Sequence, residues 1–462
     1  MPGLDAKPAD RPLAIRVLAP YADRVLGQGD HASRFRTLEL LSRVDPERVL
    51  AFLEAKRIDD PAIADHLRRA ATAHLADPDP SARLARVRVT RDVEARALAA
   101  LEDADSRPGI AKALRLECVE RALQDARAID EPGARIAALA GVADRLVALG
   151  EVVRAAGLLD HARPSAEALP AVGPGARARA AFAEALARFN PASAVELAGA
   201  VLDPSAADRA LLRVARRMAP VNPGGVPTVL GSLRDPRALA SDLPGLCHAL
   251  ARVDPAQALR LVGRARPDDP TRPAYALGMM ALAVAEVDKP AATGWLRLAF
   301  DRLGKVAASG SARHPACVAA ALLPVAERVD PALVPELFWR AVALHADSPG
   351  DDGRSEALLA LLLARYDREV ARGFFDPAAG RALASPGVDL APILAAPALL
   401  DPPLAVRLVE SLPEAPDLTF HHPKNQARLA LAAALGRGAP ACWEYATAHL
   451  LGLWTLATPE PD

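Results

Sequence analysis

A short phrase recurs along this 462-residue chain: an apolar residue, then Asp or Asn, then in most copies Pro, and then a run of helix formers. The complete copies are Val44-Asp45-Pro46, Phe189-Asn190-Pro191, Val221-Asn222-Pro223, Val253-Asp254-Pro255, Val329-Asp330-Pro331 and Leu400-Asp401-Pro402. Looser copies begin at Val287-Asp288 and Tyr366-Asp367. From Asn190 to Asp401 the Asp or Asn positions are 32, 32, 34, 42, 37 and 34 residues apart. A period in the thirties predicts stacked helical hairpins.

Each residue of the phrase suits a corner between two helices. Asp or Asn, here called position zero, can cap the first free amides of a helix, and Pro fits the next position, where no amide is needed. The preceding apolar residue and the small apolar residue at +4 would form a hydrophobic staple. With +4, the residue at +7 would form a buried stripe. The +7 residues are all bulky and apolar: Phe52, Leu197, Val229, Leu261, Trp295, Leu337, Phe374 and Leu408.

The repeats predict an all-α fold, an α-α superhelix of about twelve stacked helical hairpins, right-handed by analogy with related repeats. We expect a disordered tail over 1–12, less regular helical repeats over 13–163 and repeats with Asp/Asn-Pro corners over 176–455, followed by a second tail over 456–462. The Pro- and Gly-rich segment 164–175 is the expected break or bend in the array.

Composition narrows the class of partner. Aromatic residues make up only 4% of a chain that is 51% hydrophobic, which suits thin layers of closely packed helices. The formal net charge is -1, so no overall positive field predicts a nucleic-acid or membrane partner.

No stretch approaches the roughly 18 apolar residues of a membrane span, and the first residues do not resemble a signal peptide. Four scattered cysteines without CxxC spacing favour buried thiols in a reducing compartment, so we expect a cytoplasmic protein.

The period near 34, the short corner and the small residues of the second helix resemble bacterial α-helical repeat proteins of the tetratricopeptide-like or HEAT-like type. The W-x-x-L-G-x-x-Y consensus of tetratricopeptide repeats is absent, and the Asp-Pro corner is not part of it. The resemblance covers most of the chain and implies an architecture in which each repeat packs on its neighbours. It transfers no catalytic residue, and it implies a binding scaffold.

No motif predicts a catalytic centre, a metal site or a cofactor. His421 and His422 are adjacent, and Cys442 and His449 follow, but HExxH and paired CxxC spacings are absent, so a polar loop explains the histidines. Acidic pairs such as Asp268-Asp269 mostly precede Pro or Gly, where they can cap helices. GxSxG, the phosphate-binding P-loop and a strand followed by GxGxxG are also absent.

Two groups of residues are candidates for binding a partner. Twelve of the seventeen aromatic residues lie after residue 270. Those outside the +7 position or near the C-terminus are candidate peptide anchors: Trp339, Tyr275, Phe375, Tyr445 and Trp454. The second group is a stripe of Arg209, Arg213 and Arg216 or Arg217 at helical spacing. The stripe could bind an acidic partner or a phosphate-bearing ligand, or it could be a solvated outer face.

The function predicted from these patterns is a non-catalytic scaffold that presents a curved helical-repeat surface to an unknown protein or peptide. One alternative is an α/α-toroid enzyme, or an enzyme accessory, with a pocket between the helices. A weaker alternative is a HEAT-like protein that binds nucleic acid through arginine stripes. A toroid needs carboxylates that converge on a centre, whereas a nucleic-acid binder needs a continuous positive groove.

Overall fold

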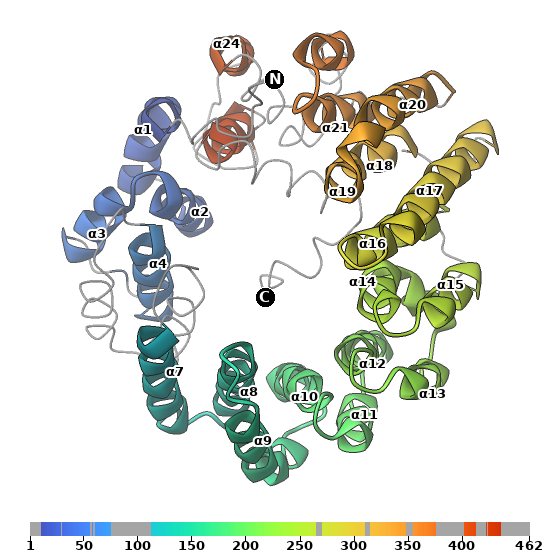
Figure 1. Cartoon of the computed structure of the whole chain (residues 1–462). Coiled ribbons are helices and arrows are strands. Elements are labelled where there is room, and N and C mark those ends of the chain that lie inside the picture. The colour runs from blue at the N-terminus through green and yellow to red at the C-terminus, as the bar shows by residue number, and fades with distance from the viewer. Residues whose placement is uncertain are drawn as a thin grey trace. The chain divides into compact units, whose positions relative to one another are not determined.

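The structure is a computed structural model that describes residues 11–28, 30–55, 58, 61–74, 112–264, 270–309, 315–347, 354–375, 402–412, 422 and 424–435. Within these ranges every regular element is an α-helix or a 3-10 helix, which confirms the all-α prediction (Figure 1). None of the helices in the described part of the chain combines the length and the apolar character needed to cross a membrane.

The chain divides into two compact units, and helix α3 (Pro46–Ala55) contains one boundary between them. Unit 1 comprises 1–49 and 268–462, and unit 2 comprises 50–267. The other helices of unit 2 are α4 (Pro61–His74), α7 (Lys112–Arg127), α8 (Pro132–Ala148), α9 (Val152–Glu167), α10 (Gly173–Leu186), α11 (Pro191–Gly199), α12 (Pro204–Met218), η2 (Pro223–Gly225), α13 (Val226–Gly231), η3 (Pro236–Ala238), α14 (Leu239–Ala251) and α15 (Pro255–Arg264).

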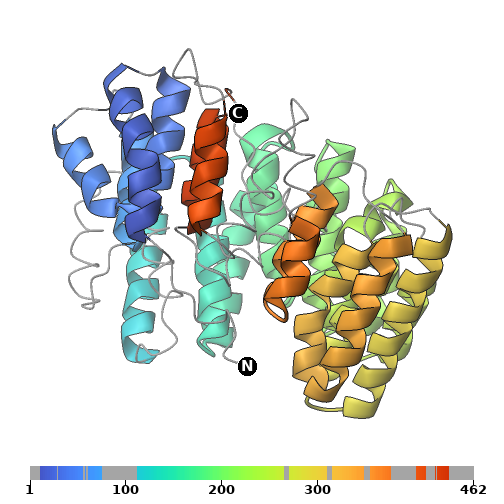
Figure 2. The same ribbon diagram turned by 90° about the horizontal axis from the view of Figure 1, so that it is seen from above.

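Unit 1 repeats the same kind of hairpin. Its helices are α1 (Arg11–Gln28), α2 (His31–Val44), α16 (Arg272–Val284), α17 (Lys289–Ser309), α18 (Pro315–Ala321), α19 (Leu323–Val329), η4 (Pro331–Leu333), α20 (Val334–Asp347), α21 (Arg354–Leu363), α24 (Pro402–Ser411) and helices over 368–375 and 424–435. Helix α16 pairs with α17, which packs on α20, and α18 packs on both α20 and α21. Figure 2 shows these yellow-to-orange helices side by side.

The hairpins of unit 2 form two rows of helices (Figure 1). In the first row α8, α10, α12 and α14 pack on one another in succession. In the second row α9, α11, α13 and α15 each pack on the first-row helix that precedes them in the chain. Each first-row helix therefore packs on a second-row partner and on its neighbours in the row.

The Asp or Asn of the repeated phrase closes one helix and begins the next, as predicted. At each described corner its backbone amide donates to the carbonyl oxygen at position −4, with N···O distances between 2.7 and 3.0 Å. Its side chain accepts a hydrogen bond from a backbone amide two or three residues later. The seven corners are at Asp45, Asn190, Asn222, Asp254, Asp288, Asp330 and Asp367. Asp401 lies outside the described residues.

The buried stripe of the second helix differs from the prediction at +7. The described +4 residues are buried except Val334, which is half-buried. At +7, Leu197, Val229, Leu261 and Leu337 are buried as predicted. The other four +7 residues are only half-buried, and the residue after each of them is buried instead: Leu53 after Phe52, Leu296 after Trp295, Phe375 after Phe374 and Val409 after Leu408. Positions +4 and +8 lie on one face because they are four residues apart, and +7 lies at its flank. Assigning Phe375 to a position outside the core was therefore wrong.

The predicted hydrophobic staple is wrong at three corners. Val221, Val253 and Val287 are exposed, whereas Val44 and Val329 are buried. At the three exposed positions the valine amide donates to the carbonyl three residues earlier, which tightens the chain into a turn before the corner. Helices α2 and α19 instead continue up to Val44 and Val329. The way in which the first helix ends therefore decides whether the valine faces the core.

The Pro- and Gly-rich segment 164–175 is a compact connection between packed helices. Helix α9 continues through Pro164 to Glu167, and α10 begins at Gly173 and packs on both α8 and α9. A Cβ atom added at Gly175 would lie 2.6 Å from the carbonyl oxygen of Pro170, so only glycine allows this approach. Both sides of the segment belong to unit 2.

Candidate functional site

Arginines occupy the least buried side of α12. This helix packs on α10, α11, α13 and α14, and it buries its alanine, leucine, valine and methionine side chains from residue 207 onward. After the first turn, every residue of α12 that is not buried is an arginine. The four are Arg209, Arg213, Arg216 and Arg217, and we call them the arginine face. The predicted stripe therefore exists as a single helix surface in unit 2.

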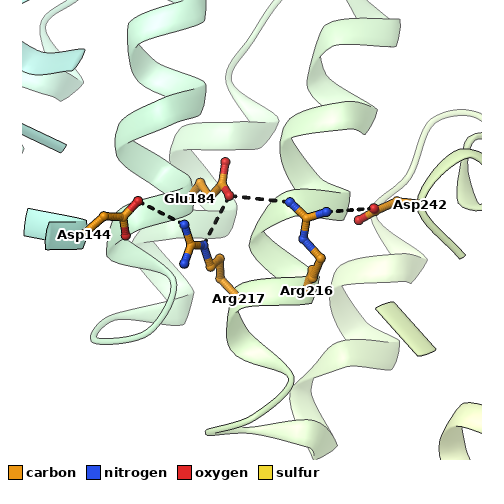
Figure 3. Close-up of polar contacts among 5 residues, drawn as sticks. All are labelled: Asp144, Glu184, Arg216, Arg217 and Asp242. Carbon is orange, nitrogen blue, oxygen red and sulfur yellow. Dashed lines mark hydrogen bonds and ion pairs between the residues drawn. The ribbon is translucent and has the colours of Figure 1, made fainter. Parts of the chain in front are cut away.

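Two of these arginines join four helices of the first row (Figure 3). Arg217 binds Asp144 of α8 at 3.0 Å and Glu184 of α10 at 3.2 Å. Arg216 lies 3.7 Å from the same Glu184 and donates a 3.0 Å hydrogen bond to Asp242 of α14. We call these five residues the ion-pair network. It crosses the row from α8 to α14 with Glu184 shared between the two arginines.

Asp242 is the most buried carboxylate of the ion-pair network. Burial raises its pKa from 3.8 to about 6, even though the Arg216 guanidinium opposes the shift. Its Oδ1 accepts from Arg216, while its buried Oδ2 has no hydrogen-bond partner in the structure. Gly245, one turn later, leaves room for the pair, because an added Cβ would lie 2.9 Å from Asp242 Oδ1 and 3.3 Å from Arg216 Nη1. Burial also raises the pKa of Asp144, against the attraction of Arg217.

Arg209 and Arg213 remain outside the ion-pair network. Arg209 is exposed and donates from Nη1 to Ser205 Oγ at 3.1 Å. Arg213 is half-buried, and it makes no ion pair with any described residue. The N-terminal part of the arginine face therefore carries two guanidinium groups that no described carboxylate neutralises by contact.

Sequence reasoning found the arginines but missed their carboxylate partners. Glu184 and Arg216 each lie six residues before a corner, at Asn190 and Asn222, and Asp144 lies six residues before Gly150, which stands between α8 and α9 where the equivalent corner falls. Equivalent positions on neighbouring first-row helices can lie side by side. Comparing position −6 across successive repeats would therefore have indicated the contacts of Glu184. Asp242 lies twelve residues before its corner, so no such alignment predicts it.

The predicted aromatic anchors differ in exposure. Trp339 on α20 is 58% exposed, and its ring meets the buried Phe338 edge to face at 5.2 Å. Tyr275 and Phe375 are buried, with 8% and 2% of their surface exposed, so neither presents a ring to a partner. Burial also raises the pKa of Tyr275 to about 12. Tyr445 and Trp454 lie outside the described residues.

Two observations on the described residues concern metal binding and nucleophilic chemistry. Within them, no three or more His, Cys, Asp or Glu side chains gather in a way that could hold a metal ion. Burial raises the pKa of the Cys247 thiol to about 12, which leaves a poor nucleophile near neutral pH. Of the residues considered for a metal site in the sequence, His421, Cys442 and His449 lie outside the described residues, and His422 Nδ1 accepts a hydrogen bond from the Lys424 amide at 3.3 Å.

Comparison with known proteins gives no match: the chain matches no protein-family model, no curated protein and no solved structure. The class of the protein is therefore defined by its fold, a helical protein whose hairpins share one capped corner.

Proposed function

We propose that this protein is a non-catalytic cytoplasmic scaffold, a right-handed α-α superhelix of about twelve hairpins that presents a helical surface to a protein or peptide. Its architecture would be of the tetratricopeptide-like or HEAT-like type. The repeated corner and the successive packing of first-row helices support the array. In such arrays each repeat buries its core face against neighbours, and the remaining face is free to bind.

The exposure of Trp339 is the observation that carries the proposal of a protein partner. A tryptophan that leaves 58% of its surface in water forgoes a large hydrophobic stabilisation, and tryptophan is enriched at the energetic centres of interfaces. The ring also contacts the buried Phe338 edge to face, with 5.2 Å between the ring centroids.

The ion-pair network bears on the nucleic-acid alternative. A phosphate backbone requires cationic side chains that are free to bind it. In the arginine face, Arg216 and Arg217 already bind three carboxylates, so the face has mixed charge. This arrangement favours a protein partner over nucleic acid. No observation on the described residues specifically favours the toroid enzyme.

The test is quantitative affinity purification from the cells that produce the protein, comparing the wild type with Trp339→Ala and with Val153→Ala. Val153 is the matched control because it is exposed and apolar but belongs to α9 in unit 2. We expect Trp339→Ala to lower recovery of a partner at least tenfold while helicity is unchanged, and Val153→Ala to have no effect. Recovery of no partner, or equal recovery by all three proteins, would contradict the proposal.

A further inference from the structure

We infer that the arginine face of α12 is a docking surface for an acidic segment of a partner protein, a run of chain in which Asp or Glu recurs at alternate positions. This inference rests on the proposed scaffold function and specifies the chemistry of one partner. It concerns unit 2, whereas Trp339 belongs to unit 1.

Positive charge is concentrated on the first row of unit 2. The helices α8, α10, α12 and α14 contain eight arginines and four carboxylates. The second-row helices α9, α11, α13 and α15 contain four arginines and three carboxylates. The excess charge therefore lies on the row that carries the arginine face.

The carboxylates of the first row are already bound within unit 2. Asp144, Glu184 and Asp242 belong to the ion-pair network. Asp208 is buried, and its two oxygens accept the backbone amides of Arg234 and Asp235 at 2.8 and 2.9 Å. No carboxylate of the row remains to neutralise Arg209 and Arg213 by contact, so an external anion would supply their missing partners.

Small residues lie on the two helices that flank α12. Position −9 relative to the corner is Arg213 on α12, Ala181 on α10 and Gly245 on α14. Ala181 lies one turn before Glu184, and Gly245 lies one turn after Asp242, so both belong to helix sides that adjoin the ion-pair network. At Gly245 an added Cβ would lie 3.3 Å from Arg216 Nη1, so α14 puts no side chain beside the arginine face at this position. A peptide that approaches the arginine face from the side of α14 therefore meets no side chain at Gly245.

The spacing of the arginines suits an extended chain. Arg209, Arg213 and Arg217 are four residues apart, so their Cα atoms are separated by roughly 6 Å along the helix axis. In an extended peptide, alternate side chains on one face are separated by roughly 6.6 Å. Carboxylates at alternate positions can therefore meet successive arginines over two or three contacts. Arginine also favours carboxylate because its planar fork can donate two parallel hydrogen bonds.

The ion-pair network would hold part of this surface in a fixed conformation. The side chains of Arg216 and Arg217 are 35% and 44% exposed while they bind their carboxylates. Their positions are thus set before a partner arrives, which reduces the entropy lost on binding. A peptide can place carboxylates beside Arg209 and Arg213 alone. A nucleic acid carries a charge at every nucleotide, so some phosphates would face Asp144 and Glu184.

The test measures binding of a fluorescein-labelled peptide of alternating Glu and Ser, about ten residues long, to the full chain by fluorescence anisotropy. The variant Arg209→Glu/Arg213→Glu reverses the charge of the two arginines that lie outside the ion-pair network. The matched control is Arg260→Glu/Arg264→Glu, which reverses two exposed arginines, also four residues apart, on α15 of the second row. Both double variants change the net charge equally. Circular dichroism confirms that each variant remains helical, and Arg213→Ala serves if the double variant does not fold.

We expect the acidic peptide to bind the wild type. Its affinity should fall at least tenfold in Arg209→Glu/Arg213→Glu and change by less than threefold in the control variant. Raising the ionic strength should weaken binding, and a Lys-Ser peptide should not bind. Three results would overturn the inference: no binding of the acidic peptide, equal loss in both double variants, or tighter binding of a single-stranded oligonucleotide of equal charge. If a partner is still captured through Trp339 in that case, the scaffold proposal stands without this inference.

Discussion

Replacing Asp242 with Asn should remove a specific pH dependence from the stability of unit 2. The pKa of Asp242 is raised from 3.8 to about 6 in the folded protein, because burial disfavours its charge more than Arg216 favours it. A difference of about 2 units at about 1.4 kcal/mol per unit gives about 3 kcal/mol. Three charged groups face this carboxylate and contribute to the shift of its pKa: Arg216 and Arg213 lower the pKa, and Glu184 raises it.

The sign follows from the direction of the shift. Since the folded state holds the Asp242 proton more tightly than the unfolded chain, the ionised carboxylate destabilises the fold. This cost is complete above about pH 6, and it disappears as the pH falls through 6 towards 3.8. Relative to Asp242→Asn, the wild type should therefore gain about 2.4 kcal/mol of stability between pH 7.5 and pH 4, which is most of the total.

Hydrogen exchange followed by mass spectrometry is the suitable assay, with peptides from α12 and α14 as reporters. All four tryptophans lie after residue 290, in unit 1, so tryptophan fluorescence would not report on unit 2. Opening free energies of wild type and variant are compared at the same pH, so intrinsic exchange rates cancel. The control is Glu120→Gln, which removes a half-exposed carboxylate paired with Arg154. A difference between the wild type and Asp242→Asn that stays constant within about 0.5 kcal/mol from pH 7.5 to 4 would refute the reasoning.

Three further predictions concern the fold. Asp254→Ala should lower the stability of α15 by about 1 kcal/mol, because the Gln257 amide loses its 2.8 Å hydrogen bond; unchanged exchange at the start of α15 would contradict this. A Cβ at Gly278 would overlap Leu322 Cδ2, so Gly278→Ala should destabilise by about 1–3 kcal/mol. Combining it with Leu322→Ala should cost less than the sum of the single changes, as measured in a double-mutant cycle. Cys247 should be alkylated roughly 10³-fold more slowly at pH 8 in the folded protein than after unfolding, as followed by mass spectrometry; equal rates would refute its burial.

The corners could be predicted from sequence because every contact in them is local. The Asp or Asn amide reaches four residues back, and its side chain reaches two or three residues forward. These distances are fixed by helix geometry, and tertiary packing changes them little. The exposure of Val221 and Val253 was not predictable in the same way. It depends on whether the first helix ends in an extra tight turn, and such alternatives differ little in energy.

The candidate site was predictable on one helix and not between helices. A spacing of three and four residues places Arg209, Arg213 and Arg217 on one face of any helix. The carboxylates that bind the arginines lie far away in the sequence: Asp144 is 73 residues from Arg217, and Asp242 is 26 from Arg216. Such pairs form only after several hairpins have packed, and pattern reading within one helix contains no information about them. The prediction that Tyr275 is exposed was wrong for the same reason, because residues distant in the sequence bury its side chain.

The repeated Asp and Asn residues use their polar groups in the hydrogen bonds of the corners. Residues that bind a partner are therefore expected at positions that vary between repeats. Position −6 shows this directly. In unit 2 it is Asp144, Glu184 and Arg216, which form contacts across the row. Before the Asp254 corner of unit 2 it is His248. In the 268–462 part of unit 1 the same position is Leu282, Pro324 and Leu361, before the Asp288, Asp330 and Asp367 corners, whereas before the Asp45 corner of unit 1 it is Glu39. The same corner therefore accommodates charged side chains at this position in one series of hairpins, α8 to α12, and apolar side chains in another, α16 to α21. For this reason we expect the acidic partner at unit 2 and a contact dominated by Trp339 at unit 1.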